Sequence, residues 1–496
     1  MIHNITKWLD EAAGKYPNKI AIVDKERAIT FQELRYKALS LAEVIVEKGL
    51  FKEAIVVLMP KSIDAIICFL GIAYSGNFYS VIDVEMPLLR QKKIIETLEP
   101  KLVISTLDRI EIGDVDVYQY DFKKLDLSCE KNVIRQRDNT CDTDLLYVLF
   151  TSGSTGIPKG VTITHQSVID YIDWVEETFS IKEYDSFGNQ APFYFDNSVL
   201  DIYTMVKTGA TMYIIPRELF SQPVLLLEYL KENQITTIFW VPSAMIIVAN
   251  LHALKKVDLS KSLKRILFAG EVMPNKQLNI WRKYIPDAMY VNLYGPTEIT
   301  VDCTYYIVNR NFEDGESLPI GKRTRNSEVL VLNENDKLVK VGEIGELCVR
   351  GVSLSKGYYN NIKKTQEVFV QNPLNNKYIE YIYRTGDLVK YNELGELIYV
   401  SRKDYQIKHL GHRIELGEIE TLVSSMDEVK QCCCIYDHVK NKIILFVLGI
   451  VNQENVFLLL KNSLPYYMIP AKIIQLSEFP ITQNGKIDRK KMQEFI

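Results

Sequence analysis

The chain has 496 residues, of which 47% are hydrophobic and 25% are charged, and its formal net charge is -4. This balance is typical of a soluble globular protein, and it argues against a general binder of nucleic acid or of membrane surfaces. A chain of this length exceeds one ordinary core, so two or more domains are expected. Its longest apolar stretches, such as residues 65–74, are much shorter than the ~20 residues that a membrane span needs. The polar N-terminus also lacks the apolar core of a signal peptide, which predicts a cytoplasmic protein.

Short β-branched runs alternate with helix-length amphipathic stretches through the first two thirds of the chain. The predicted buried strands are residues 55–59, 102–105, 145–150, 237–241 and 265–269. The predicted helices are residues 63–75, 223–233 and 275–284. This alternation predicts an α/β fold in which the strands are layered against helices and run parallel.

From about Glu328 the strands become shorter and the turn signals more frequent, which predicts a small β-rich unit. A second α/β stretch follows, with predicted helices at 416–426 and 455–463 and predicted strands at 431–437 and 443–450. We therefore predict a large N-terminal domain of layered α/β subdomains over residues 1–401. It would include a small β-barrel-like subdomain over about 328–401. A small mobile α+β domain is predicted over residues 402–496, with the boundary near Asp404.

The cysteines offer little sign of a metal site or of disulfides. The run Cys432, Cys433 and Cys434 lies in an apolar, strand-like context, where neighbouring side chains point to opposite faces. No pair has the C-x-x-C spacing of a typical zinc site. We interpret these residues as reduced thiols of the core.

A loop rich in glycine and hydroxyl groups follows the predicted strand at 145–150. Its glycines would let backbone N–H groups approach a polyanion, its hydroxyls would donate hydrogen bonds, and Lys159 would add positive charge. It is not a Walker loop, which requires Lys followed by Ser or Thr. A flexible Ser/Gly loop without a ligand is the alternative interpretation. The loop residues concerned are Thr151, Ser152, Gly153, Ser154, Thr155, Gly156 and Lys159.

This loop and several later segments together resemble the adenylate-forming superfamily, which includes acyl-CoA synthetases, luciferases and the adenylation domains of nonribosomal peptide synthetases. The matching segments are residues 269–271, 292–298, 345–351, 383–387, 401–420 and 484–489. One such segment is weak evidence, but the same order over nearly the whole chain is specific. The resemblance implies that the cofactors are ATP and Mg²⁺.

The resemblance also implies the nucleotide site. Tyr294 would stack on adenine, Asp387 would accept hydrogen bonds from the two ribose hydroxyls, and Arg402 would face the nucleotide. For Tyr294 the alternative is a buried tyrosine beside a Gly-Pro turn, and for Asp387 it is a turn aspartate. The remaining residues implied to contact the nucleotide are Ser152, Gly153, Ser154, Thr155, Gly156, Ala269, Gly270, Glu271, Asn292, Leu293, Gly295 and Thr297.

The implied catalytic residues are Thr151, Lys159, Glu298 and Lys486. Glu298 would hold Mg²⁺, which prefers oxygen ligands, beside the triphosphate. Lys486 would bridge the attacking carboxylate and the α-phosphate, where negative charge builds in the transition state. A solvated lysine in a basic tail is the alternative interpretation for Lys486. Asp404 would be the hinge about which the small domain turns.

Asp196 indicates which class of acid is activated. Aromatic residues flank it, and no basic residue lies within ten positions, so a buried carboxylate here would need a cation from elsewhere. By resemblance to peptide-synthetase adenylation domains, that cation is the α-ammonium of an amino acid. The alternative is that Asp196 caps the helix that follows.

The resemblance implies a pocket for the substrate side chain. Trp240 would fill volume and favour a small side chain, such as that of serine or alanine, while Asp302 would bond a hydroxyl or a cation. The pocket residues are Asp196, Asn197, Leu200, Trp240, Leu267, Ala269, Leu293, Val301 and Asp302.

The expected reaction is adenylation of an amino acid, followed by transfer to the phosphopantetheine thiol of a separate carrier protein. We expect a free-standing enzyme, because no carrier region follows the lysine segment. The overall pattern resembles D-alanine–carrier protein ligases, but Ala269 stands where those enzymes have a cysteine. Such a ligase, or an acyl- or aryl-CoA synthetase of the same fold, is therefore the alternative. Neither nucleic acid nor a membrane is expected as a partner.

Overall fold

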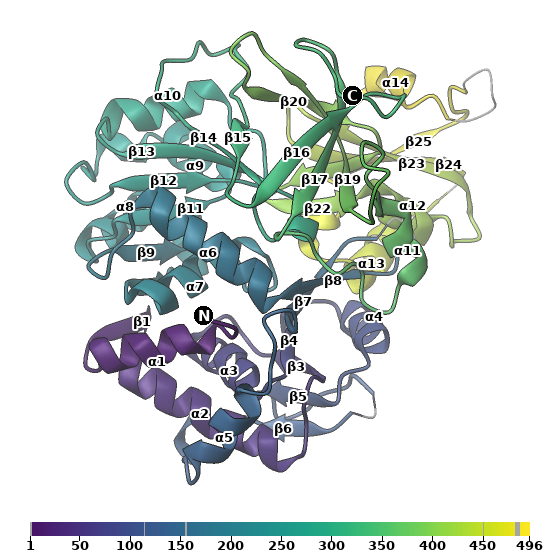
Figure 1. Ribbon diagram of the computed structural model, residues 1–496. Coiled ribbons are helices and arrows are strands. Elements are labelled where there is room, and N and C mark those ends of the chain that lie inside the picture. The colour runs from purple at the N-terminus through teal and green to yellow at the C-terminus, as the bar shows by residue number, and fades with distance from the viewer. Residues whose placement is uncertain (1, 114, 154–155, 450, 482–486) are drawn as a thin grey trace.

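A computed structural model describes the chain except for residues 1, 114, 154–155, 450 and 482–486 (Figure 1). Two mixed sheets form the centre of the larger part of the molecule. The first has the strand order β6 (Val117–Gln119), β5 (Leu102–Ser105), β3 (Ala54–Leu58), β4 (Phe78–Ile82), β7 (Leu145–Thr151), β8 (Lys159–Thr164). The second has the order β15 (Lys322–Arg323), β14 (Thr304–Ile307), β13 (Met289–Tyr294), β12 (Arg265–Phe268), β11 (Thr237–Trp240), β9 (Ser186–Asn189), β10 (Thr211–Ile214), β1 (Ile20–Asp24), β2 (Arg27–Thr30).

The parallel pairing predicted from the alternating pattern is confirmed in both sheets. The strands β3, β4 and β5 pair in parallel, and so do β9, β11, β12 and β13. Because these strands are buried on both faces, most of them are apolar runs, such as Ala54–Leu58 and Leu102–Ser105, that do not alternate with exposed polar residues. Helices cover the sheets. They are α1 (Thr6–Lys15), α2 (Phe31–Glu47), α3 (Ile63–Tyr74), α4 (Leu88–Leu98), α5 (Glu130–Arg137), α6 (His165–Phe179), α7 (Asn197–Thr208), α8 (Pro223–Glu232), α9 (Pro242–Asn250) and α10 (Asn275–Tyr284).

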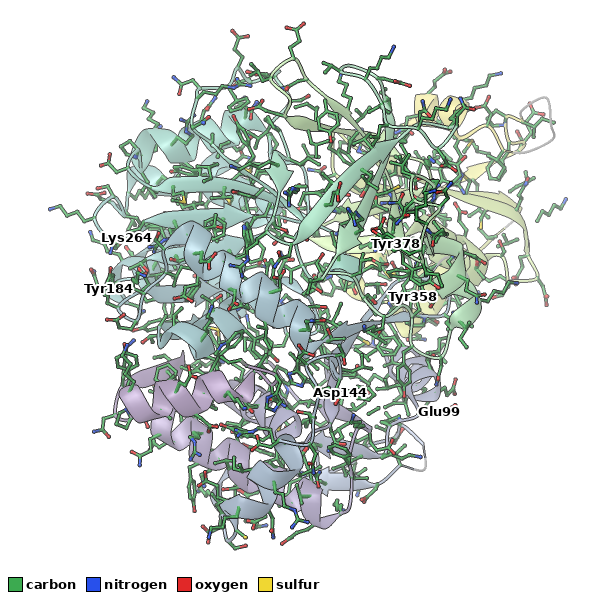
Figure 2. All side chains as sticks on the ribbon, in the orientation of Figure 1. Glu99, Asp144, Tyr184, Lys264, Tyr358 and Tyr378 are labelled. Carbon is green, nitrogen blue, oxygen red and sulfur yellow. The ribbon has the colours of Figure 1, made fainter. Side chains whose placement is uncertain are left out.

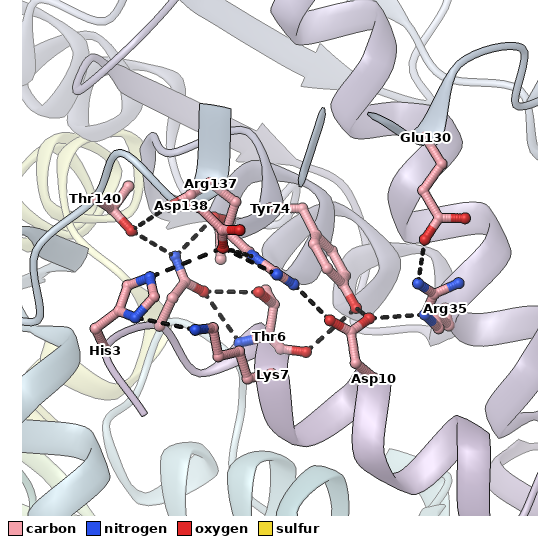
Figure 3. Close-up of polar contacts among 12 residues, drawn as sticks. His3, Thr6, Lys7, Asp10, Arg35, Tyr74, Glu130, Arg137, Asp138 and Thr140 are labelled. Carbon is pink, nitrogen blue, oxygen red and sulfur yellow. Dashed lines mark hydrogen bonds and ion pairs between the residues drawn. The ribbon is translucent and has the colours of Figure 1, made fainter. Parts of the chain in front are cut away.

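Capping and charge hold the N-terminal helices in place. Helix α2 begins with a capping box, in which Thr30 and Glu33 satisfy each other's backbone N–H groups. The carboxylate of Asp10 on α1 accepts hydrogen bonds from Arg35, Tyr74 and Arg137, as Figure 3 shows. Three elements that are distant in sequence are therefore tied to one partly buried carboxylate.

The predicted β-rich unit is observed as a sheet that starts at Ser327. Its strands are β16 (Ser327–Leu332), β17 (Gly345–Gly351), β18 (Phe369–Gln371), β19 (Tyr381–Tyr391) and β20 (Leu397–Arg402), all paired antiparallel. The helix α11 (Ile362–Val368) packs beside it. This unit lies between the central sheets and the C-terminal segment in Figure 1.

The C-terminal segment combines a hairpin, a small sheet and short helices. Its elements are β21 (Gln406–His409), β22 (His412–Glu415), α12 (Leu416–Val423), β23 (Val429–Asp437), β24 (Lys442–Gly449), α13 (Gln453–Ser463), β25 (Lys472–Leu476) and α14 (Arg489–Met492). The helix predicted to reach Met426 ends at Val423, and residues 424–426 continue as a turn.

As predicted, the three adjacent cysteines alternate between faces: Cys433 packs in a different cluster from Cys432 and Cys434. All eight cysteines lie in described residues and are free.

Within the described residues, no helix is both long enough and apolar enough to cross a membrane.

A buried ion pair at the start of β12 is important for stability. Arg265 donates to Asp185 at 2.9 Å and also to two backbone carbonyls, and the Asp185 side chain is fully buried. We expect Arg265→Met to lower the free energy of unfolding by about 3–5 kcal/mol, because it leaves Asp185 buried without its cation. Denaturant unfolding would measure this. Lys364→Met, which removes a half-exposed pair with Glu367, should cost no more than about 1 kcal/mol. Equal losses in the two variants would contradict the role given to the Arg265 pair.

Candidate active site

The ends of several strands converge on one edge of the two sheets. The phosphate loop follows β7, residues 269–271 follow β12, and Gly295 follows β13. Loops at the carboxyl ends of parallel strands are the usual location of ligand sites in α/β proteins. The hairpin β21–β22 lies against this edge, so the C-terminal segment contributes side chains to the same site.

Tyr294, Asp387, Arg402 and Asp404 form a first cluster, which we call the nucleoside cluster. The Tyr294 hydroxyl donates to one oxygen of Asp387, and Arg402 donates to the other at 2.6 Å. Arg402 also bonds both oxygens of Asp404, at 2.6 and 2.8 Å. The Lys408 ammonium lies 5.2 Å from the centre of the Tyr294 ring. In this arrangement a cation from the hairpin therefore lies over the ring that is predicted to stack on adenine.

A second cluster, which we call the phosphate cluster, surrounds Glu298. Its carboxylate accepts from Tyr358 (labelled in Figure 2) at 2.6 Å and from Arg413 at 2.6 Å. Burial alone would raise the pKa of Glu298, but Arg413 and Lys159 outweigh it and lower the pKa to about 2. Glu298 is therefore ionised at neutral pH, as an oxygen ligand to a cation must be.

The hairpin also contacts the phosphate loop. The Ser152 hydroxyl donates to the Arg413 carbonyl at 2.8 Å, and it accepts from the Glu415 N–H at 3.1 Å. The Lys159 ammonium lies 3.3 Å from Glu415. Arg413 and Glu415 thus occupy the hydrogen-bonding groups predicted to bind phosphates, so a triphosphate could bind there only if the hairpin withdraws.

The loop glycines have a conformational role within the loop itself. A Cβ on Gly153 would lie 2.0 Å from the Ile157 carbonyl oxygen, and Gly156 has φ +76°. The hydroxyl of Thr151 is buried without a partner among the described residues. Ser154, Thr155 and Lys486 lie outside the described residues.

Asp196 lies at the N-terminal end of α7 with its side chain buried. It occupies the cap position but makes no cap hydrogen bond, so the capping interpretation is wrong. Burial raises the pKa of Asp196 to about 6, although Thr297 hydrogen-bonds to its carboxylate. The positive charge of Lys408 also acts on this carboxylate and lowers its pKa, an influence that the local sequence did not predict. Asp196 also interacts electrostatically with Glu298, so it lies beside the phosphate cluster.

The residues predicted to line the side-chain pocket are all buried: Asp196, Asn197, Leu200, Trp240, Leu267, Ala269, Leu293, Val301 and Asp302.

Two residues predicted to contact the nucleotide make hydrogen bonds within the protein instead. The Asn292 amide donates to the Pro319 carbonyl at 2.8 Å, while Glu271 accepts from the backbone N–H groups of Ser243 and Gly411. Sequence reasoning missed Lys408 and Arg413 as individual contributors, although both lie in the matched segment 401–420.

Two neighbouring cavities lie at the site. A small one of about 40 Å³ is lined by Asp196, Thr297, Ser152, Arg413 and other residues. A larger one of about 600 Å³ lies between Asp83–Pro87 and the C-terminal residues Leu464–Ile469. Tyr194 and Tyr467 line both cavities. His412, which lines the small cavity, stacks on Tyr467 with ring centres 3.6 Å apart.

Comparisons with known proteins identify relatives of this chain. A model of the family described as AMP-binding enzyme matches residues 9–359. Gramicidin S synthase 1 of Brevibacillus brevis is 31% identical over 505 residues, which cover 99% of this chain and 44% of that protein. This chain thus spans less than half the length of that relative. Zwittermicin A synthase ZmaJ of Bacillus cereus is 32% identical over 508 residues, covering 98% of this chain and 94% of that protein.

The fold has a solved counterpart as well. The crystal structure of the Vibrio cholerae adenylation domain AlmE, in complex with glycyl-adenosine-5'-phosphate, matches with a TM-score of 0.87. The match covers 100% of this chain and 98% of that one at 22% identity, a level that supports likeness of fold alone.

Proposed function

The chain belongs to the family of AMP-binding enzymes and is an AMP-forming ligase, and we propose that its substrate is an amino acid. The amino acid would react with ATP to give an aminoacyl-AMP and pyrophosphate. The acyl group would then pass to the phosphopantetheine thiol of a separate carrier protein. The observation that carries the choice of an amino acid is Asp196: a buried carboxylate that caps no helix and lies beside the phosphate cluster.

In the first step, the substrate carboxylate would attack the α-phosphorus of ATP and displace pyrophosphate. Tyr294 would hold adenine and Asp387 the ribose hydroxyls, while Ser152 and Lys159 would bind phosphate oxygens. Glu298 would hold Mg²⁺, which when bound neutralises phosphate charge. The lone carboxylate fits this role, because Mg²⁺ is commonly held by one or two carboxylates together with substrate phosphates. Lys486 would stabilise the charge that develops between the reacting oxygens.

The hairpin contacts support a second arrangement for the second step. Since Arg413 and Glu415 occupy the phosphate cluster, the described arrangement fits the enzyme after pyrophosphate has left. We place the turn between arrangements at Asp404, with residues 402–496 moving relative to residues 1–401. The larger cavity would admit the thiol arm, since it shares Tyr194 and Tyr467 with the cavity that reaches Asp196.

Two alternatives on the same fold make different demands on Asp196. A D-alanine–carrier protein ligase would use the same carboxylate for the same ammonium group. An acyl- or aryl-CoA synthetase would leave Asp196 buried without its ligand cation, at a cost of several kcal/mol. The observed burial of Asp196 therefore favours an amino-acid substrate.

Pyrophosphate exchange over a panel of amino acids, both enantiomers, and their deaminated analogues tests the proposal. We expect exchange with at least one amino acid and at least a hundredfold lower kcat/KM with its deaminated analogue. Equal exchange with the deaminated acid would contradict the role of Asp196 and favour a CoA synthetase.

The raised pKa of Asp196 gives a pH dependence. Only the ionised carboxylate can pair with the substrate ammonium, and burial raises its pKa to about 6. As the pH falls through 6, we expect the KM for the amino acid to rise about tenfold per pH unit. Steady-state exchange kinetics between pH 5 and 8 would measure this. The pH dependence should be absent in Asp196→Asn, and an unchanged profile in that variant would assign the titration to another group.

A further inference from the structure

A buried ion pair joins the C-terminal segment to helix α4. The Arg90 guanidinium of α4 donates to the Glu418 carboxylate of α12 at 2.6 Å, across 328 positions of the sequence. The two side chains are only 5% and 3% exposed. Helix α13 packs on α4 as well, so α4 is a surface on which residues 402–496 dock (Figure 1).

Each of the two charges depends on the other. Arg90 lies in the first turn of α4, where the helix dipole disfavours a cation, and that turn contains no acidic residue. The second carboxylate oxygen of Glu418, Oε2, is buried without a hydrogen-bond partner among the described residues. Within that part of the chain, neither side chain makes another ion pair. A buried charge whose partner is missing is strongly unfavourable, so neither residue tolerates this arrangement without the other.

The Arg90–Glu418 pair differs from the other contacts that the C-terminal segment makes. Arg413 and Glu415 occupy groups that are expected to bind phosphates, so those contacts must break when ATP binds. Arg90 instead lines the small cavity together with Tyr467. Tyr467 also lines the larger cavity, which would admit the thiol arm. The pair therefore lies beside the expected path of the thiol.

We infer that Arg90 and Glu418 are positioning residues for the transfer of the acyl group to the thiol. Their pair holds residues 402–496 against α4 in the described arrangement, and it breaks when that segment turns about Asp404 for adenylation. Both charges then return to water, where neither needs the other. This inference rests on the proposed function, because it assigns the described arrangement to the second step.

Removal of one charge should therefore affect the two steps unequally. Arg90→Met or Glu418→Met leaves the partner charge buried only in the docked arrangement, so docking becomes rarer while the arrangement for adenylation is unaffected. The double variant removes both charges, and apolar side chains of similar volume can replace a buried ion pair without loss of stability. It should therefore regain most of what each single variant loses, which a general loss of structure would not do.

The two steps are measured separately with the full chain. Adenylation is followed by pyrophosphate exchange with the best amino acid of the panel, and transfer by the rate at which enzyme-bound aminoacyl-AMP acylates D-pantetheine. We expect each single variant to slow transfer by about twentyfold or more and to keep exchange within about threefold of the wild type. The double variant should recover transfer to within about fivefold of the wild type.

Lys48→Met is the matched control for the loss of one charge. It removes a cation from an exposed pair with Asp116 that lies wholly within residues 1–401, at 2.7 Å. It should change neither step, because exposed pairs contribute little. Equal losses of both steps in the single variants, or no recovery of transfer in the double variant, would overturn the inference.

Hydrogen exchange tests the pair without any substrate. In the described arrangement the Gly411 N–H donates to Glu271 and the Glu415 N–H donates to Ser152, so docking protects both amides. Mass spectrometry should find about fivefold or more faster exchange of a peptide spanning residues 406–415 in each single variant, and nearly wild-type exchange in the double variant and the control. Unchanged exchange in both single variants overturns the inference. If no amino acid supports pyrophosphate exchange, the proposed function fails, and the assignment of the pair to thiol transfer fails with it.

Discussion

Asp196→Asn is expected to lower kcat/KM for amino-acid-dependent pyrophosphate exchange by about 10²- to 10³-fold. The substitution keeps the size of the side chain and removes the charge that would pair with the substrate ammonium. Truncating one partner of a buried charge pair costs about 3–5 kcal/mol, and the expected loss corresponds to about 3–4 kcal/mol, in the lower part of that range. Initial-rate exchange assays at saturating ATP would measure it.

Asp201→Asn is the matched control for this variant. Asp201 lies on the same helix and is equally buried, but its carboxylate accepts from Asn189 at 2.7 Å and takes no part in the candidate site. We expect its exchange rate to stay within about threefold of the wild type. Similar losses in both variants, with unchanged melting temperatures, would mean that Asp196 is only a structural carboxylate.

Lys486→Ala is expected to reduce adenylation by about a thousandfold while leaving thioester formation from pre-made aminoacyl-AMP nearly unchanged. An oriented cation that meets developing charge contributes several kcal/mol, and only the first step develops charge between carboxylate and α-phosphate. The two steps would be measured separately, by pyrophosphate exchange and by loading of a carrier protein with the adenylate.

Lys491→Ala provides the comparison, because Lys491 is an exposed residue of the same basic tail. It should alter neither step. Equal loss of both steps in Lys486→Ala would contradict the proposed rotation about Asp404, since one lysine would then serve both reactions.

Much of the fold was predictable from local pattern. The strand at 102–105 and the helix at 275–284 have the predicted bounds. Each was predicted from the pattern of neighbouring residues, a short β-branched run for the strand and an amphipathic run for the helix. The predicted helix at 416–426 was too long, because the apolar periodicity continues into the turn after Val423. The division into residues 1–401 and 402–496 stays a prediction.

Only those residues of the candidate site that belong to sequence motifs could be predicted. Tyr294, Asp387 and Arg402 were placed in one site from sequence, and they contact one another. The partners that cover them were not predictable. Arg413 meets Glu298 across 115 positions, and Tyr171 meets Asp302 across 131. Such contacts depend on how loops and the hairpin pack, which no local pattern encodes. For the same reason, the sequence around Asp196 did not predict that the charge of Lys408 would act on it.

A crystal structure with a non-hydrolysable aminoacyl-adenylate analogue tests the central claim most directly. We predict that its adenine lies against Tyr294, its ribose hydroxyls bond Asp387, and its ammonium group lies within hydrogen-bond distance of Asp196. An analogue bound with its adenosine far from Tyr294 and Asp387 would contradict the account.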